Sequence, residues 1–71
     1  MENFKDRLKI LRIEKGLSQK AVALKIGISP TCYAGYEQGY REPDLATLKK
    51  LCAFFETSSD YLIGLNDYDL E

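Results

Sequence analysis

Hydrophobic residues recur every three or four positions along most of this chain, which is the spacing of one face of an α-helix. In the first such segment Phe4, Leu8 and Leu11 repeat at this interval, and lysines and arginines fill the flanks. The pattern therefore predicts an amphipathic helix over roughly residues 3–15. No alternation of apolar and polar residues is long enough to predict a β-strand.

Serine and glycine residues predict where the first three helices begin and end. Ser18 stands where its hydroxyl can cap the N-terminus of a helix. Ser29 can do the same for the next helix, whose first residue is a proline, because the fixed φ of proline suits that position. Glycine suits the left-handed residue that follows a helix. The predicted helices are Phe4–Lys15, Gln19–Ile26 and Pro30–Gln38, ended by Gly16, Gly27 and Gly39.

Two more helices are predicted after a polar loop. Apolar residues at three- and four-residue steps define the main core helix, from about Leu45 to Phe55. Its apolar stripe consists of Leu45, Leu48, Leu51, Cys52 and Phe55. Ser58 or Ser59 can cap a short fifth helix that ends at Gly64. The predicted fold is all-α, with five short helices in one domain over residues 1–65 and a short acidic C-terminal tail over residues 66–71.

The charge balance counts against a nucleic-acid partner at first sight. The formal net charge of the 71 residues is −1 and the pI is about 5.4, whereas nucleic-acid binders are usually basic. Nine of the ten lysines and arginines precede Lys50, however, and residues 60–71 carry four acids and no base. A local positive field can therefore survive elsewhere, because charges more than about 8 Å apart are largely screened.

The sequence offers little for catalysis or metal binding. It has no histidine, and Cys32 and Cys52 lack the spacing of a zinc site. No glycine-rich loop can hold a phosphate, and no nucleophile is placed beside a base. We therefore expect no enzymatic activity, no metal and no cofactor. With two cysteines expected to be reduced, and with no signal peptide or membrane span evident, the sequence predicts a cytoplasmic protein.

The stretch from Gln19 to Gln38 has the organisation of a helix-turn-helix. Two short helical segments flank the turn at residues 27–29, and the small side chain of Ala23 lets the second segment cross the first closely. This geometry holds one helix against another and presents it to the major groove of DNA. The sequence therefore predicts that the function lies in this stretch.

These residues resemble the lambda repressor/Cro-type helix-turn-helix family, also called the XRE family, over residues 4 to about 64. The matching residues are Leu11-Arg12, Lys15-Gly16-Leu17-Ser18-Gln19, Ala23, Ile26-Gly27-Ile28-Ser29, Tyr36-Glu37-Gln38-Gly39, Arg41-Glu42-Pro43-Asp44, Thr47-Leu48 and Asp60-Tyr61-Leu62-Ile63-Gly64. The resemblance implies a five-helix domain that docks its third helix in the major groove, often as a dimer on a palindromic operator.

The resemblance also implies roles for individual residues. Gln19 matches a family glutamine that hydrogen-bonds a DNA phosphate, and the alternative is an ordinary exposed polar residue. Arg12 and Glu37 match a pair that forms a partly buried, structural salt bridge between the first and third helices.

The face of the third helix that should meet the bases is Thr31, Ala34, Gly35 and Gln38, spaced i, i+3, i+4 and i+7. Other members of the family often carry Arg, Gln, Asn or Ser at the positions held here by Pro30, Ala34 and Gly35. Few direct hydrogen bonds from this face to the bases are therefore expected beyond those of Thr31 and Gln38. We therefore expect operator shape and half-site spacing to supply specificity, and phosphate contacts to supply affinity. The expected phosphate contacts are Gln19, Pro30, Tyr36, Tyr40 and Arg41, with a solvated loop as the alternative for Tyr40 and Arg41.

Two functions from different classes fit these residues. The first is a sequence-specific DNA-binding transcriptional regulator, and more specifically a repressor, whose partner is a double-stranded DNA operator. It is expected to be a homodimer, with an interface around Tyr61, Leu65 and Tyr68, although these residues can equally close the core of a monomer. The second is a protein-interaction module, such as an antitoxin or a regulator subunit. Neither function requires a membrane or a small-molecule substrate.

Overall fold

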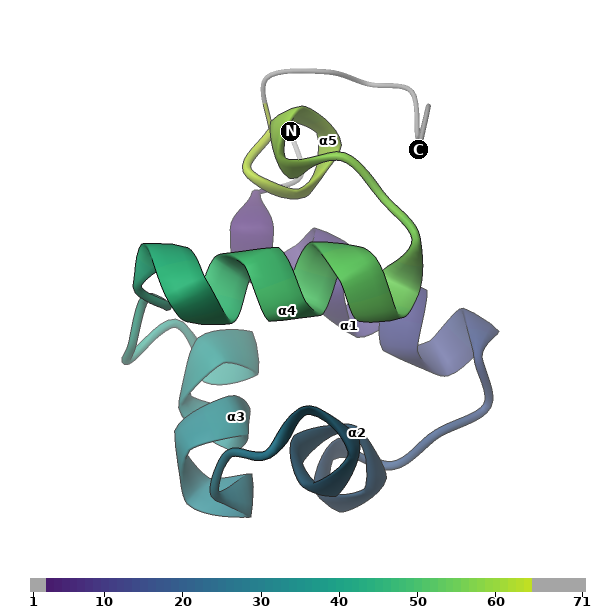
Figure 1. Ribbon diagram of the computed structural model, residues 1–71, viewed down its shortest axis with the longest axis vertical. Coiled ribbons are helices and arrows are strands. Elements are labelled where there is room, and N and C mark those ends of the chain that lie inside the picture. Colours follow the sequence, from purple (N-terminus) through teal and green to yellow (C-terminus); the bar gives the residue numbers. More distant parts are fainter. Residues whose placement is uncertain (1–2, 65–71) are drawn as a thin grey trace.

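The computed structural model describes residues 3–64, which form helices joined by short turns (Figure 1). The predicted all-α class is confirmed, and each predicted helix lies within one or two residues of its expected bounds. The helices are α1 (Phe4–Glu14), α2 (Gln19–Ile26), α3 (Pro30–Gln38), α4 (Leu45–Phe55) and α5 (Ser59–Leu62). The predicted tail at residues 66–71 lies outside the described residues.

Side-chain caps and left-handed glycines set the ends of the two central helices. The hydroxyl of Ser18 accepts a hydrogen bond from the backbone N–H of Ala21 at 3.0 Å, and Ser29 does the same for Cys32. Each serine therefore satisfies a backbone donor that a helix N-terminus leaves free. Gly27 ends α2 with a φ of +82°, which L side chains rarely adopt. These local signals keep α2 and α3 short and the turn between them tight.

The core lies where α1, α2, α3, α4 and α5 converge. Its fully buried residues are Leu8, Val22, Ala23, Tyr33, Leu51 and Leu62. Since Ala23 carries only a methyl group, α2 and α3 pack closely across it. The core thus fixes the angle at which α3 stands against the rest of the domain (Figure 1).

Two residues depart from the pattern expected of them. Leu45 was expected on the core stripe of α4, but the structure leaves it 77% exposed, because the first turn of α4 extends beyond the helices that α4 covers. Arg7 is one of the basic residues that flank the apolar stripe of α1, but it is buried at 3% exposure. Its guanidinium lies 4.6 Å from the ring centroid of Tyr61 and donates to the Tyr61 carbonyl oxygen at 2.9 Å. Arg7 therefore ties α1 to α5.

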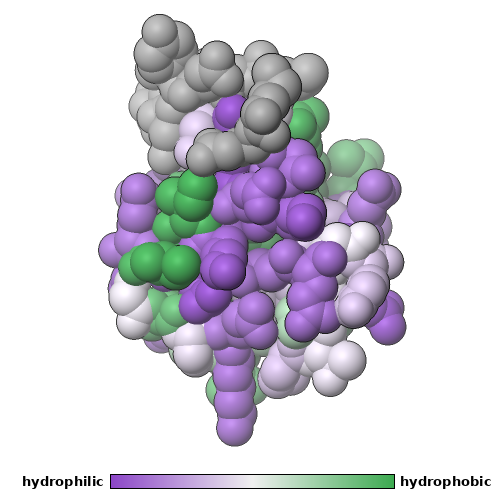
Figure 2. Space-filling model, turned by 180° about the vertical axis from the view of Figure 1, so that it is seen from behind, coloured by the Kyte–Doolittle hydropathy of each residue, from purple (hydrophilic) through white to green (hydrophobic). Residues whose placement is uncertain are grey.

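The surface is mainly hydrophilic on the side seen in Figure 2, where apolar side chains form a few separate groups. The large apolar side chains that are most exposed are Ile13, Leu24, Tyr40, Leu45 and Ile63. Within residues 3–64, no helix has the length and apolar character needed to cross a membrane.

Candidate nucleic-acid interface

The helix α3 has a buried face and an exposed face. Tyr33 and Glu37 turn inward, at 0% and 9% exposure. Thr31 and Gln38 lie exposed on the opposite side, with the half-exposed Ala34 between them. The strip expected to meet DNA bases is therefore outward at three of its four positions. Because α2 braces α3 from behind, this strip can approach a groove without unpacking the core.

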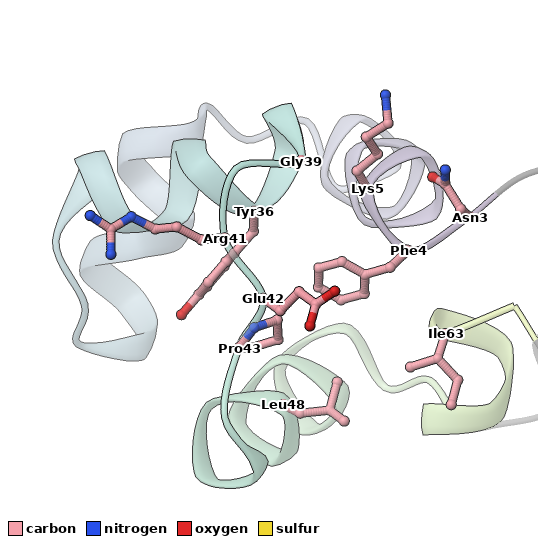
Figure 3. Close-up of a pocket in the computed structure, with 10 residues that line it drawn as sticks. All are labelled: Asn3, Phe4, Lys5, Tyr36, Gly39, Arg41, Glu42, Pro43, Leu48 and Ile63. Carbon is pink, nitrogen blue, oxygen red and sulfur yellow. The ribbon is translucent and has the colours of Figure 1, made fainter.

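Gly35, the fourth position of the strip, does not lie where it was predicted. It was expected to face the bases directly, but it is buried beneath the side chain of Arg41. A Cβ atom at Gly35 would lie 2.8 Å from Cδ of Arg41, closer than real Cβ contacts come. The Arg41 side chain therefore occupies the space over Gly35 that a longer residue on α3 would otherwise take. Figure 3 shows its guanidinium extending back along α3.

The prediction for Tyr36 was also wrong. It was expected to contact phosphate, but only 5% of it is exposed. Its ring packs edge-on against Phe4 and Tyr33, at centroid distances of 6.4 and 6.2 Å, and its hydroxyl accepts from the thiol of Cys32. Burial, and then hydrogen bonding to Cys32, raise the pKa of Tyr36 to about 12. Tyr36 therefore belongs to the core that supports α3.

The remaining residues of the expected phosphate-contacting set are accessible at the ends of α2 and α3. Pro30 is exposed at the first position of α3, and the adjoining loop leaves Tyr40 82% exposed and Arg41 exposed. Gln19 is half-buried at the first position of α2. One N–H of its amide is used inside the protein, so the second N–H is the donor that it can offer a phosphate.

A salt bridge between Arg12 and Glu37 holds α1 against α3. Nε of Arg12 lies 2.7 Å from one carboxylate oxygen of Glu37, and Nη2 lies 3.1 Å from the other. The side chains are only 14% and 2% exposed, so the pair is bidentate and shielded from water. The amide of Gln19 donates to the same carboxylate at 3.0 Å, which brings α2 into the network. One buried carboxylate thus connects the three helices that orient the exposed strip.

The environment of Glu37 makes stability depend on pH. Burial alone would raise its pKa, but hydrogen bonds from Arg12 and other donors outweigh burial, so the pKa is lowered. The stabilisation is therefore fully present above the unfolded-state pKa of about 4.3 and is lost as the pH falls through the lower folded-state value. We expect Glu37→Gln to be less stable than the wild type at neutral pH, with a gap that narrows below about pH 4. Urea unfolding across this range measures the gap, and a gap that widens on acidification would contradict this assignment.

The described residues contain no group of three or more histidine, cysteine, aspartate or glutamate side chains that could hold a metal ion. A hollow of about 500 Å³ lies behind the exposed strip, among α1, α4, α5 and the loop after α3 (Figure 3). Phe4, Tyr36 and Leu48 form apolar parts of its lining. A second, shallow depression lies on the strip itself, and its lining consists of Thr31, Ala34, Gly35, Gln38, Tyr40 and Arg41.

Comparison with known proteins agrees with this geometry. A family model described as Helix-turn-helix matches residues 8–62, which include all of α2, α3 and α4. The chain belongs to this helix-turn-helix family. The resemblance to the XRE type drawn from the sequence is therefore confirmed.

The family's curated relatives include bacterial and phage regulators. The chain is 46% identical over 59 residues to the HTH-type transcriptional regulator AnsR of Bacillus subtilis, covering 83% of this chain and 51% of that protein. It is 41% identical over 61 residues to ImmR of the same organism, covering 86% and 48%. It is 38% identical over 68 residues to the phage CTXphi transcriptional repressor RstR of Vibrio cholerae, covering 96% and 61%. This helix-turn-helix chain thus spans about half the length of the curated relatives it matches.

Two solved structures share the fold. The restriction-modification controller protein C.AhdI from Aeromonas hydrophila has a TM-score of 0.77 and 33% identity, over 84% of this chain and 91% of that one. The P22 c2 repressor, solved in complex with a synthetic operator, has a TM-score of 0.86, over 93% of this chain and 100% of that one. At 23% identity, the likeness to P22 c2 establishes the fold alone. The predicted lambda repressor-like architecture is confirmed.

Proposed function

We propose that this chain is the DNA-binding part of a transcriptional regulator, and more specifically of a repressor, which docks α3 in the major groove of a double-stranded operator. The observation that carries the proposal is the exposed strip of Thr31, Ala34 and Gln38 on a helix that α2 and the Glu37 network brace from behind. Family membership supports it, as do relatives named as transcriptional regulators and a repressor. The proposal includes a cytoplasmic location and no catalytic activity, since the chain contains no histidine and no paired nucleophile and base.

A homodimer is the assembly that fits this function. Two copies of α3 about 34 Å apart would meet successive major grooves on one side of a duplex. Of the expected interface residues, Tyr61 is half-buried against Arg7, and Leu65 and Tyr68 lie outside the described residues. Sedimentation of the free protein and of its complex with a selected duplex measures the stoichiometry. Two protomers on each duplex would support the proposal, and one protomer would refute the dimer.

Salt dependence and sequence preference together test the DNA-binding function. With four phosphates neutralised, affinity should fall about 100-fold as salt rises from about 50 to about 200 mM. Affinity for a duplex selected from a random pool should also exceed affinity for a scrambled duplex at every salt concentration. Fluorescence anisotropy with both duplexes gives the two measurements. Equal, salt-insensitive binding to the two duplexes would overturn the proposal.

The alternative, a protein-interaction module, has one specific observation in its favour. Leu24 and Leu45 are 65% and 77% exposed, and each is a large apolar side chain on a helix. Single exposed leucines are common on proteins that bind no partner, so we favour the DNA-binding function. A complex with another protein that forms without DNA, combined with no sequence preference among duplexes, would favour the alternative.

A further inference from the structure

Arg41 is the only lysine or arginine between Lys25 and Lys49, a stretch that includes all of α3. The exposed strip of α3 itself carries short or neutral side chains, at Thr31, Ala34 and Gln38. Direct readout of bases needs long side chains with well-placed donors, and among the residues that line the depression on this strip Arg41 is the one with a cationic side chain. Its position therefore decides how the strip can recognise DNA.

The backbone of Arg41 is fixed by Gly35. The carbonyl oxygen of Gly35 accepts hydrogen bonds from the backbone N–H groups of Gly39, Tyr40 and Arg41, at 3.0, 2.9 and 3.3 Å. The loop after α3 thus folds back onto the last turn of the helix. Gly39 makes this turn possible with a φ of +88°, which favours glycine. The side chain of Arg41 consequently starts beside the last turn of α3.

The side chain of Arg41 then crosses α3 over the same glycine. An added Cβ at Gly35 would lie 2.8, 3.0 and 3.3 Å from Cδ, Cγ and Nε of Arg41, so any other residue there would displace the arginine. Glycine within a helix costs about 1 kcal/mol relative to alanine. The space that Gly35 leaves for Arg41 supplies a physical reason for this residue in the middle of a helix.

The guanidinium of Arg41 is available to a ligand. It has no hydrogen bond or ion pair with any of residues 3–64, and the side chain is exposed. It extends along α3 in Figure 3, away from Phe4 and Lys5. Arg41 also lines the shallow depression on the strip, together with Thr31, Ala34 and Gln38. The charged end of the side chain therefore belongs to the face proposed to enter the groove.

We propose that Arg41, whose side chain lies over Gly35, reads a base edge in the major groove and prefers guanine, so that a loop residue supplies the long cationic side chain that α3 lacks. The planar guanidinium can donate two parallel hydrogen bonds to O6 and N7 of guanine, an arrangement that an ammonium group cannot match in the same way. The alternative role, a phosphate contact, would add affinity without sequence preference. This inference rests on the proposed DNA-binding function.

The test compares the sequence preferences of the wild type and three variants, by selecting bound duplexes from a random pool. Arg41→Lys retains the positive charge and removes the planar fork. Arg41→Ala removes both the charge and the planar guanidinium. Gly35→Ala keeps the arginine but fills the space over residue 35 in which the arginine side chain lies. In each variant, we expect the preference for guanine over the other bases at one position of each half-site to fall by about 10- to 100-fold. Preferences at the other positions should be retained. Thermal unfolding of each variant verifies that the fold is intact. If Gly35→Ala fails to fold, Arg41→Lys still tests the inference, because it changes only an exposed side chain.

The wild-type result separates failure of this inference from failure of the proposed function. A wild type that selects no duplex would overturn both. A wild type that selects an operator, with Arg41→Lys selecting the same guanine equally strongly, would overturn only the base-reading role. In that case Arg41→Ala should weaken binding to all duplexes alike and should reduce the slope of log affinity against log salt by about 1, as a phosphate contact does.

Discussion

Replacing Arg12 with methionine is expected to lower the free energy of unfolding by about 3–5 kcal/mol, because it leaves the carboxylate of Glu37 buried without its charged partner. That carboxylate is only 2% exposed and cannot regain full hydration. Methionine retains an apolar stem, so the loss of packing around the replaced residue is kept small. Urea unfolding at neutral pH measures the change, and the midpoint of thermal unfolding should fall by more than about 10 °C.

The double variant Arg12→Met/Glu37→Met separates the coupling from the cost of each single change. Removing both charges leaves no stranded ion, so the double variant should be more stable than the sum of the two single changes predicts. The difference in free energy of unfolding between the wild type and Arg12→Met should also shrink as the pH falls. Without Arg12, burial raises the pKa of Glu37, and protonation then removes the stranded charge. Strictly additive single changes would contradict a structural role for this pair. Arg12 also donates to the carbonyl oxygen of Leu17 at 2.8 Å, so the isosteric Glu37→Gln provides the narrower comparison.

The elements of this fold could be predicted because their signals are local. The capping hydroxyls of Ser18 and Ser29 act on backbone groups three residues away, and Gly27 and Gly39 act on the turn in which they stand. Such effects need no knowledge of what packs where. The Arg12–Glu37 pair spans 25 residues, and the sequence indicated it only through resemblance to a family. The structure contains the pair with bidentate geometry.

Where the structure differs from the sequence-based predictions, the cause lies in tertiary contacts. Periodicity placed Leu45 on the core stripe of α4, but which turns of a helix are covered depends on where the neighbouring helices end. Periodicity placed Arg7 on the flank of the first helix, outside its apolar stripe, whereas the ring and carbonyl oxygen of Tyr61 give it a buried partner 54 residues away. The contact between Gly35 and Arg41 depends on the path of a loop, for which the sequence carried only one signal: Arg41 is the single cation between Lys25 and Lys49.

Replacing Thr31 with glutamate is expected to weaken binding to the selected operator by about 100-fold, because a carboxylate would enter a groove walled by phosphates. Thr31 is exposed at the second position of α3, so the longer side chain displaces nothing in the core. The first turn of α3 carries no acid, and a negative charge there interacts favourably with the helix dipole. Stability should therefore be unchanged or slightly higher while affinity falls. Anisotropy titrations and thermal unfolding measure the two quantities.

Two control variants assign the loss to charge at the groove. Thr31→Gln adds nearly the same bulk without charge and should lose less than about 10-fold, since glutamine can still donate to a base or a phosphate. Ala53→Glu puts the same charge at an exposed position in the last turn of α4, at the end of that helix away from α3 (Figure 1), and should leave affinity within about 2-fold because salt screens charges beyond about 8 Å. Equal losses from Thr31→Glu and Ala53→Glu would mean that net charge, not the position of Thr31, controls binding. Since the chain has a net charge of −1, its affinity for DNA must come from where the charges stand, and these variants measure that dependence.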